Sequence, residues 1–302
     1  MKKIYIILAL CLAGAATAKA QNFPVLLIGS DPSATALGAS AVGRNATAFA
    51  ADNNAAAMSL SSNRFDVAAG YQMWQPGTAD GMILGFGTYY RIDDKMAIGL
   101  GGKYLKDRET YITSAVGAVT GSFVPSDMTV NAGFSYSFVE GLSAGVNVKF
   151  LSSTLSQEAS GTAFGADVTV AYRKDGLSAG AGVYNLGSSL KYSKTAYALP
   201  GAVKAGASYA LGAGGTSVIT PSAEVDYLLS GGLMAGLGAE YAFKDMVFVR
   251  AGYHYGDAEK AIPSYGALGL GAKFAGAHLD LSYILADNPL GGTLSISLGY
   301  SF

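Results

Sequence analysis

Cysteine is almost absent from the chain: Cys11 is the only one, and it lies in an apolar run near the N-terminus. That run has the features of a removable leader, so the mature chain has neither a disulfide bond nor a thiol nucleophile. Histidine is nearly as scarce, since only His254 and His278 occur. Two histidines are too few for a metal site without carboxylate help, so we predict no metal and no cofactor.

Charge is scarce as well. Charged residues make up 14% of the chain, against about 25% in typical soluble domains. Loss of Lys2, Lys3 and Lys19 with the leader leaves 17 basic against 21 acidic residues, a mildly acidic balance that argues against a nucleic-acid partner. After the leader, no stretch approaches the roughly 18 consecutive apolar residues of a spanning helix. An apolar chain without spanning helices indicates a closed β-barrel as its membrane form.

The N-terminus has the order of a secretory signal. Lys2 and Lys3 precede an apolar run from Ile4 to Ala16, and Ala18-Lys19-Ala20 follows before Gln21. This order predicts a signal peptide over residues 1–20, cut near Ala20, and a mature protein that leaves the cytoplasm.

The last residues alternate strictly. Leu294, Ile296, Leu298, Tyr300 and Phe302 share one face, and the residues between them are serine or glycine. A period of two indicates a strand, which we expect over Leu290 to Phe302. Its apolar face with aromatics at the very end fits a lipid-facing barrel strand. The ending is similar to the C-terminal signature of bacterial outer-membrane barrels, so Tyr300 and Phe302 are the expected signal for the barrel-assembly machinery.

The same alternation repeats from Phe65 onward. It predicts an all-β fold over residues 63–302, a transmembrane antiparallel β-barrel of about 14 strands, each long enough to cross the bilayer when tilted. Short connections alternate with longer ones such as Lys106 to Ser126, Ser153 to Gly161 and Leu186 to Pro200. Aromatic residues near both ends of most strands predict two belts at the membrane interfaces. The belt on the long-loop side is expected to contain Trp74, Tyr104, Phe150, Tyr184, Tyr227, Tyr253, Tyr255 and Tyr283.

Residues 21–62 do not alternate. The segment is rich in Ala, Ser, Asn and Gly, with a short helix expected from Asn45 to Leu60 and a turn at Asp31-Pro32. It has too little bulk for a core of its own, so we expect a hatch or plug inside the barrel lumen.

Polar side chains occupy the strand faces opposite the apolar ones. If the barrel closes, these side chains point inward and must pair with each other, with the plug or with water. The lumen-facing candidates are Lys103, Asn147, Lys149, Asp167, Lys204, Glu224, Asp226, Glu240, Arg250, His254, Lys273 and Asp280.

Two local features allow a second interpretation. Glu224 and Asp226 share a face and suggest a carboxylate pair, but no nucleophile motif, phosphate loop or metal cluster accompanies them, so we predict no enzymatic activity. Gly99, Gly101 and Gly102 either kink a strand to open a side window toward lipid or permit close packing against the plug.

The run Pro24 to Val42 resembles the opening of the PorV/PorQ family, whose Asp-x-x-Ala-x-x-Leu/Met-Gly pattern is carried here by Asp31, Ala34, Leu37 and Gly38. The family's Asn-Pro-Ala corresponds to Asn54-Ala55-Ala56, a departure at the proline. Trp74-Gln75-Pro76 is similar to the family's Trp-x-Pro at the end of the first strand.

This resemblance implies a FadL-like barrel with an N-terminal hatch in the bacterial outer membrane. It also implies a non-enzymatic component of type IX secretion that docks or shuttles cargo, with a translocon barrel or cargo C-terminal signal domains as partners besides the bilayer. The alternative is a FadL-like transporter of hydrophobic small molecules. Docking would use the long outer loops, and transport would use the lumen.

Overall fold

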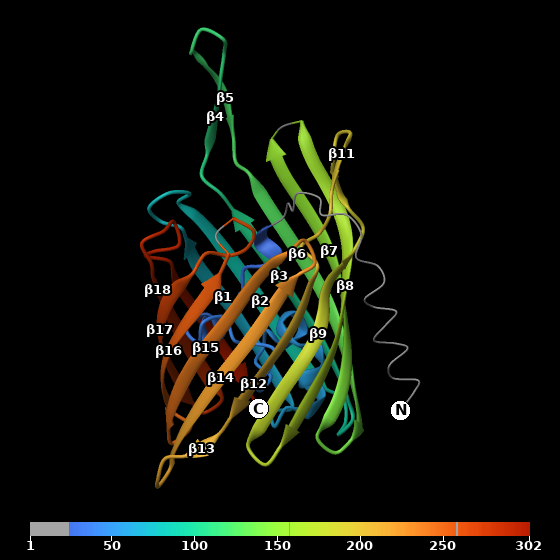
Figure 1. Cartoon of the computed structure of the whole chain (residues 1–302), viewed down its shortest axis with the longest axis vertical. Helices are drawn as coiled ribbons and strands as arrows, with labels where there is room; N and C mark the ends of the chain where they lie inside the picture. Colours follow the sequence, from blue (N-terminus) through green and yellow to red (C-terminus); the bar gives the residue numbers. More distant parts are fainter. Residues whose placement is uncertain (1–23, 157, 258) are drawn as a thin grey trace.

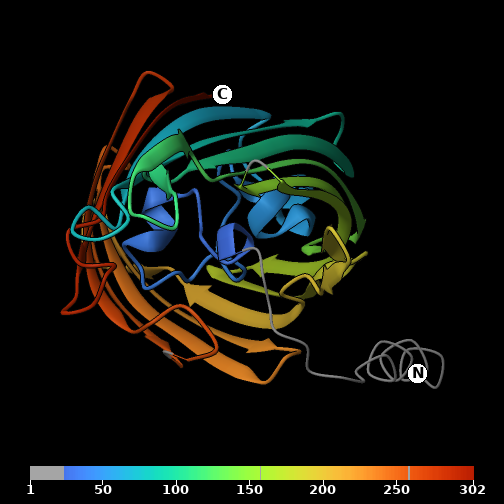
Figure 2. The same cartoon turned by 90° about the horizontal axis from the view of Figure 1, so that it is seen from above.

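The computed structural model describes residues 24–302, apart from residues 157 and 258, and consists of one barrel with a folded segment inside it (Figures 1 and 2). The wall is built from β1 (Phe65–Trp74), β2 (Gly81–Arg91), β3 (Met96–Lys106), β6 (Ser126–Val139), β7 (Leu142–Ser156), β8 (Ala159–Lys174), β9 (Leu177–Gly187), β12 (Ala202–Tyr209), β13 (Leu211–Gly212), β14 (Ser217–Leu228), β15 (Gly232–Phe243), β16 (Val247–Gly256), β17 (Tyr265–Phe274), β18 (Ala277–Leu285) and β19 (Leu294–Ser301).

The wall closes because its first and last strands pair. Residues 66–73 of β1 lie antiparallel to residues 294–301 of β19, and all other neighbouring wall strands are also antiparallel. The sheet has 15 strands, of which β13 continues β12 along the same edge of β14, so 14 strands surround the lumen. The predicted antiparallel barrel of about 14 strands is confirmed. Among the described residues, no helix is long and apolar enough to cross a membrane.

Alternation along each strand separates a lipid-facing surface from a lumen surface. On β19, Leu298 is 63% exposed while its neighbour Ser297 is 2% exposed. The same contrast recurs around the wall, with Val, Leu, Ile and aromatic side chains outside. Because each strand pairs on both sides, the wall satisfies its backbone N–H and C=O groups without water, as a bilayer requires.

The two ends of the barrel differ in their connections. The short-turn end has tight turns, of which Asp175-Gly176 and Ala275-Gly276 have positive φ at both residues, the conformation that matches strand twist in a two-residue hairpin. The long-hairpin end includes β4 (Thr110–Thr113) with β5 (Val119–Phe123), and β10 (Leu190–Tyr192) with β11 (Thr195–Tyr197). Figure 1 shows β4 and β5 projecting beyond the wall.

One expected long connection is wrong. Most of residues 153–161 belongs to β7 and β8, whose ladder continues until Ser156 pairs with Ala159. Apart from Leu155, the outward residues there are Ser and Thr, so the regular hydrophobic alternation ends while the backbone pairing continues. Backbone pairing needs no apolar side chain, and the alternation alone therefore underestimated the length of these strands.

The aromatic belts are present, with two corrections. Tyr104, Tyr227, Tyr253, Tyr255 and Tyr283 are exposed on the outer face of the wall. Tyr184 is buried and donates a hydrogen bond from its hydroxyl to the carbonyl of Asn53 at 2.8 Å, so it faces the lumen. Trp74 also faces inward and packs against buried apolar clusters.

The inner segment, defined here as residues 24–62, lies inside the ring of strands in Figure 2. Its elements are short: η1 (Pro24–Leu26), α2 (Pro32–Thr35), α3 (Ala50–Asn53) and η2 (Ala55–Leu60). The helix expected over residues 45–60 is interrupted at Asn54, which is extended. The Asn54 side chain accepts a hydrogen bond from the N–H of Ala56 and donates one to the carbonyl of Val42, and these local bonds compete with a continuous helix.

Deleting Phe302 is expected to lower the yield of folded barrel several-fold. The carbonyl of Phe302 accepts hydrogen bonds from the N–H groups of Arg64 and Phe65, and its ring lies 5.4 Å from that of Phe65, so the deletion weakens the strand pair that closes the wall. Heat-modifiable migration of the membrane fraction on a gel measures the folded yield. Phe138→Ala, an exposed aromatic near a short turn, is the matched control, and equal yields for the two variants would contradict the prediction.

Candidate functional site

The inner segment and the wall fit together through small residues. A Cβ atom added to Gly87 would lie 2.5 Å from the carbonyl oxygen of Ala48, and one added to Gly145 would lie 2.4 Å from the amide nitrogen of Ala56. Any larger wall residue at these two positions would displace the backbone of the inner segment.

The glycines of β3 serve the same packing. A Cβ atom on Gly99 would lie 2.6 Å from the sulfur of Met58. The ladders of β3 with β2 and β6 run without interruption past Gly99, Gly101 and Gly102. Close packing against the inner segment therefore accounts for Gly99, and the wall has no side window at these residues.

Asp52 of α3 joins the inner segment to the wall by charge. One carboxylate oxygen lies 2.9 Å from Nζ of Lys103 and the other lies 3.2 Å from Nζ of Lys149. Burial favours the neutral form of Asp52, but the two lysines outweigh it and hold the pKa of Asp52 well below its usual range. This carboxylate is thus a charged tether between the two parts of the molecule.

The two lysines have further partners. Nζ of Lys103 donates to the carbonyl of Ile28 at 2.8 Å, and Nζ of Lys149 lies 2.9 Å from the Asp167 carboxylate. Asp167 also accepts hydrogen bonds from Asn147 Nδ2 at 2.9 Å and from the N–H of Asn185 at 2.8 Å. These bonds satisfy the charges in a site where an unpaired charge would be costly.

Glu224 and Asp226 bind to different parts of the structure. Glu224 accepts hydrogen bonds from the N–H groups of Ala41 and Val42, at 2.6 and 2.7 Å, and thereby binds the inner segment. Asp226 lies 3.0 Å from Nζ of Lys204 on the neighbouring strand β12. Each carboxylate therefore has its own structural partner.

A second polar cluster lies toward the short-turn end. Nε of Arg250 lies 2.6 Å from the Glu240 carboxylate and its Nη1 lies 2.5 Å from that of Asp280. Arg44 of the inner segment is 3.6 Å from Glu240, so this cluster also contacts the segment. Lys273 is more peripheral, since its partner Asp245 is largely exposed.

His254 is buried against the inner segment. Its Nδ1 lies 3.3 Å from the carbonyl oxygen of Gly38, and its ring stacks on Tyr265 at 4.8 Å. Of the sequence candidates, Lys103, Lys149, Asp167, Glu224, Asp226, Arg250 and His254 are buried, and Lys204, Glu240, Lys273 and Asp280 are half-buried.

Some polar residues of the lumen were not anticipated. Alternation in strands identifies only polar residues of the wall, and Asp52 lies outside the strands. Its one available signal is that it is a lone acidic residue in the alanine-rich stretch 45–60. Asp66 was also overlooked, and its carboxylate lies 2.9 Å from Nε2 of His278. Arg44, at the second cluster, was overlooked as well. In the described part of the chain, no group of three or more His, Cys, Asp or Glu residues has an arrangement that would hold a metal.

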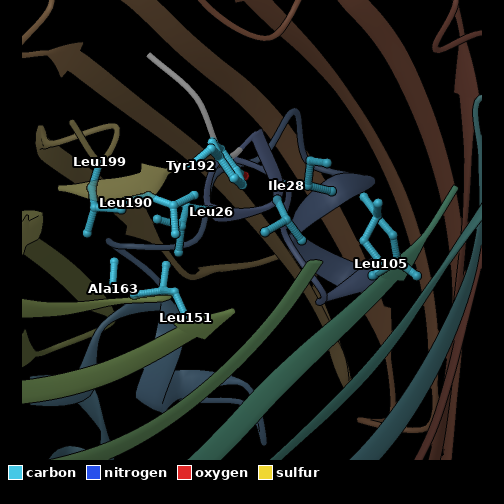
Figure 3. Close-up of a cluster of buried hydrophobic side chains, with 10 residues drawn as sticks. Leu26, Ile28, Leu105, Leu151, Ala163, Leu190, Tyr192 and Leu199 are labelled. Atoms are coloured by element: carbon cyan, nitrogen blue, oxygen red, sulfur yellow. The ribbon is translucent and has the colours of Figure 1, made fainter. Parts of the chain in front are cut away.

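An apolar cluster covers the lumen at the long-hairpin end (Figure 3). Leu26 and Ile28 of the inner segment belong to it together with Leu190, Tyr192 and Leu199, which come from the connection that carries β10 and β11. Because these three are buried, that connection packs over the lumen and is not a free outer loop.

Two cavities lie at opposite ends of the inner segment. The upper cavity, of about 90 Å³, lies toward the long-hairpin end and has charged lining from Asp52, Lys149 and Lys204 and apolar lining from Leu27 and Leu290. The lower cavity, of about 240 Å³, lies toward the short-turn end and is lined mainly by polar side chains. The inner segment thus separates an upper cavity with charged and apolar lining from a lower cavity with mainly polar lining.

Comparisons with known proteins agree on a membrane barrel. A family model described as the type IX secretion system protein PorV matches residues 15–232. No curated protein matches the chain in sequence.

Solved structures share the fold at low identity. The P. putida toluene transporter TodX is 13% identical, with 91% of this chain and 99% of that chain covered and a TM-score of 0.68. The Ralstonia pickettii toluene transporter TbuX is 14% identical, with 91% and 98% covered and a TM-score of 0.65. A Pseudomonas aeruginosa FadL homologue is 15% identical, with 90% and 98% covered and a TM-score of 0.56. The architecture is therefore that of FadL-like outer-membrane barrels.

Asp52→Asn is expected to reduce the free energy of unfolding by about 1–3 kcal/mol, because it removes the charge that two buried lysines face. Denaturant unfolding of the purified barrel measures the change. Asp93→Asn, in an exposed turn, is the control, and an equal effect of both substitutions would contradict the assigned tether.

The contribution of Asp52 is also expected to depend on pH. Because folding lowers its pKa, its stabilisation is complete above the pKa of the unfolded chain, about 4, and is lost as the pH falls through the folded pKa. The stability difference between wild type and Asp52→Asn should therefore stay constant from about pH 8 to about pH 5 and shrink below about pH 4. A difference that grows on acidification would be inconsistent with this sign.

Proposed function

The chain belongs to the family of the type IX secretion system protein PorV, and we propose that it acts as a non-enzymatic docking or shuttle component of that secretion route. The proposed partners are a translocon barrel of the same system or the C-terminal signal domains of its cargo. The family match over residues 15–232 is the observation that carries this proposal.

The filled lumen supports a docking role. The inner segment occupies the barrel interior through close backbone contacts and ion pairs, and an apolar cluster covers one end. A folded protein cannot pass through such an interior, so a protein partner would bind outside the lumen. Function in protein secretion then depends on the exposed surface at one end of the barrel.

The hairpin of β4 and β5 is the most prominent exposed element at the long-hairpin end (Figure 1). Its two strands pair only with each other, and Tyr111 and Val119 are largely exposed on it. At its tip Val116 is 90% exposed. Exposed apolar side chains on a projecting element are typical of a protein-binding surface.

Family and fold are those of bacterial outer-membrane barrels. We infer that residues 1–20, most of which precede the family match and all of which lie outside the described residues, are a signal peptide removed near Ala20. Residues 21–62 would serve as the hatch and residues 63–302 as the membrane barrel. The partners would then include the bilayer and the barrel-assembly machinery, which would read Tyr300 and Phe302.

Transport of hydrophobic small molecules is the second candidate function. The apolar half of the upper cavity, with Leu26, Leu27, Trp74 and Leu290, favours it. Its volume of about 90 Å³ is smaller than the roughly 150 Å³ of a cavity that holds benzene, so a hydrophobic solute would require the inner segment to move.

Replacing residues 107–125 with Asn-Gly is expected to abolish recovery of secretion partners in a gentle detergent pull-down. Lys106 and Ser126 pair directly, so a two-residue turn joins them without disturbing the wall. The matched control replaces residues 75–80 with Asn-Gly between the paired residues Trp74 and Gly81. Mass spectrometry identifies the recovered proteins, and heat-modifiable migration verifies that both variants fold.

Two results would overturn the docking proposal. One is full recovery of a large translocon barrel or cargo from the variant that lacks β4 and β5. The other is a wild-type barrel that purifies alone with a hydrophobic molecule in its lumen, which would support transport instead.

A further inference from the structure

Three cavities follow one another through the inner segment. Between the upper and lower cavities lies a middle cavity of about 10 Å³, enclosed by the inner segment itself. Ala41 and Asn53 line both the upper and the middle cavity, while Asp31, Arg44 and Thr47 line both the middle and the lower one. Single layers of side chains therefore separate one cavity from the next.

The middle cavity is suited to water. A space of about 10 Å³ is the size that holds about one water molecule, provided that polar partners surround it. Its polar lining consists of Asp31, Arg44, Asn45, Thr47, Asn53 and Asn54, and the other residues that line it are alanines. For a hydrophobic solute, the middle cavity offers only the methyl groups of these alanines as apolar surface.

Asp31 lies between the middle and lower cavities, since it lines both of them. Its Oδ2 accepts hydrogen bonds from Thr47 Oγ1 at 2.8 Å and from Asn53 Nδ2 at 3.4 Å. The other oxygen, Oδ1, caps α2. It accepts hydrogen bonds from the N–H of Ser33 at 2.9 Å and from the N–H of Ala34 at 3.3 Å. One carboxylate oxygen thus holds the helix while the other holds two residues that line the route.

We propose that the inner segment contains an axial route for water and small cations, closed by the hydrogen bonds that Oδ2 of Asp31 accepts from Thr47 and Asn53. The preference for cations follows from the lower cavity, which is lined by five carboxylates against four basic side chains, namely Arg44, Arg250, Lys273 and His278. In the upper cavity three carboxylates face three lysines. The route is a property of the lumen and does not depend on the proposed docking function.

Asp31→Asn tests the closure without removing the helix cap. The asparagine Oδ1 can still accept from Ser33 and Ala34, whereas its NH₂ group cannot accept from Asn53 and can bond to Thr47 only as a donor to the hydroxyl oxygen. Purified protein in planar bilayers with a KCl gradient is expected to show single-channel openings about tenfold more often than wild type, because the hydrogen bond from Asn53 is lost and the bond with Thr47 no longer involves a carboxylate. The reversal potential should indicate K⁺ over Cl⁻.

Thr47→Val removes one donor and keeps the Asp31 charge, so it should also increase the openings and leave the cation preference unchanged. Asp93→Asn is the control, because Asp93 likewise accepts two backbone hydrogen bonds but lies in an exposed turn. Heat-modifiable migration verifies folding of all variants. Wild-type conductance in both folded test variants would overturn the route, and a preference for Cl⁻ would overturn its assigned selectivity.

Discussion

The hydrogen-bond ladder that joins β1 to β19 is the constraint on which the rest of the structure depends. A bilayer offers no water to unpaired N–H and C=O groups, so every wall strand needs a neighbour on both sides. Residues 66–73 meet residues 294–301, and the last carbonyl of the chain accepts hydrogen bonds from Arg64 and Phe65. The wall is therefore complete only when both ends of the barrel sequence have met.

Closure creates a lumen, and the filling of that lumen explains the unusual composition. Glycines such as Gly87 and Gly145 let the backbone of the inner segment approach the wall, and alanines on the segment complete the contact. Charged groups are tolerated inside because they meet opposite charges or backbone groups, as Asp52 and Glu224 do. The abundance of glycine therefore reflects the close fit of the inner segment, whereas the low overall charge follows from the apolar outer face of the wall.

The filled lumen also separates the molecule into two kinds of surface. The exterior carries an apolar belt and a projecting hairpin, and these suit lipid and a protein partner. The interior carries paired charges and small cavities, which suit water and small solutes. A single chain thus combines a surface for large partners with an interior that admits only small ones.

Much of the fold was predictable because its signals are local. A period of two identified the strands, and the number of strands followed from the repetition of the pattern. Local signals failed where backbone pairing continued without apolar residues, at β7 and β8, and where aromatic residues faced inward, at Trp74 and Tyr184. Alternation shows which residues share a face, but the side that faces lipid near a strand end depends on what the lumen contains.

The sequence by itself determined the membrane wall. A barrel in lipid requires each strand to alternate between apolar and polar residues, and this alternation is a property of neighbouring residues in the chain. Only the tertiary structure decided the contents of the lumen. The contacts of Asp52 with Lys103 and Lys149, and of Glu224 with Ala41, join residues that are far apart in the chain. Pairing of charges across a closed lumen depends on which strands face each other, and that arrangement exists only once the ring has formed around the inner segment.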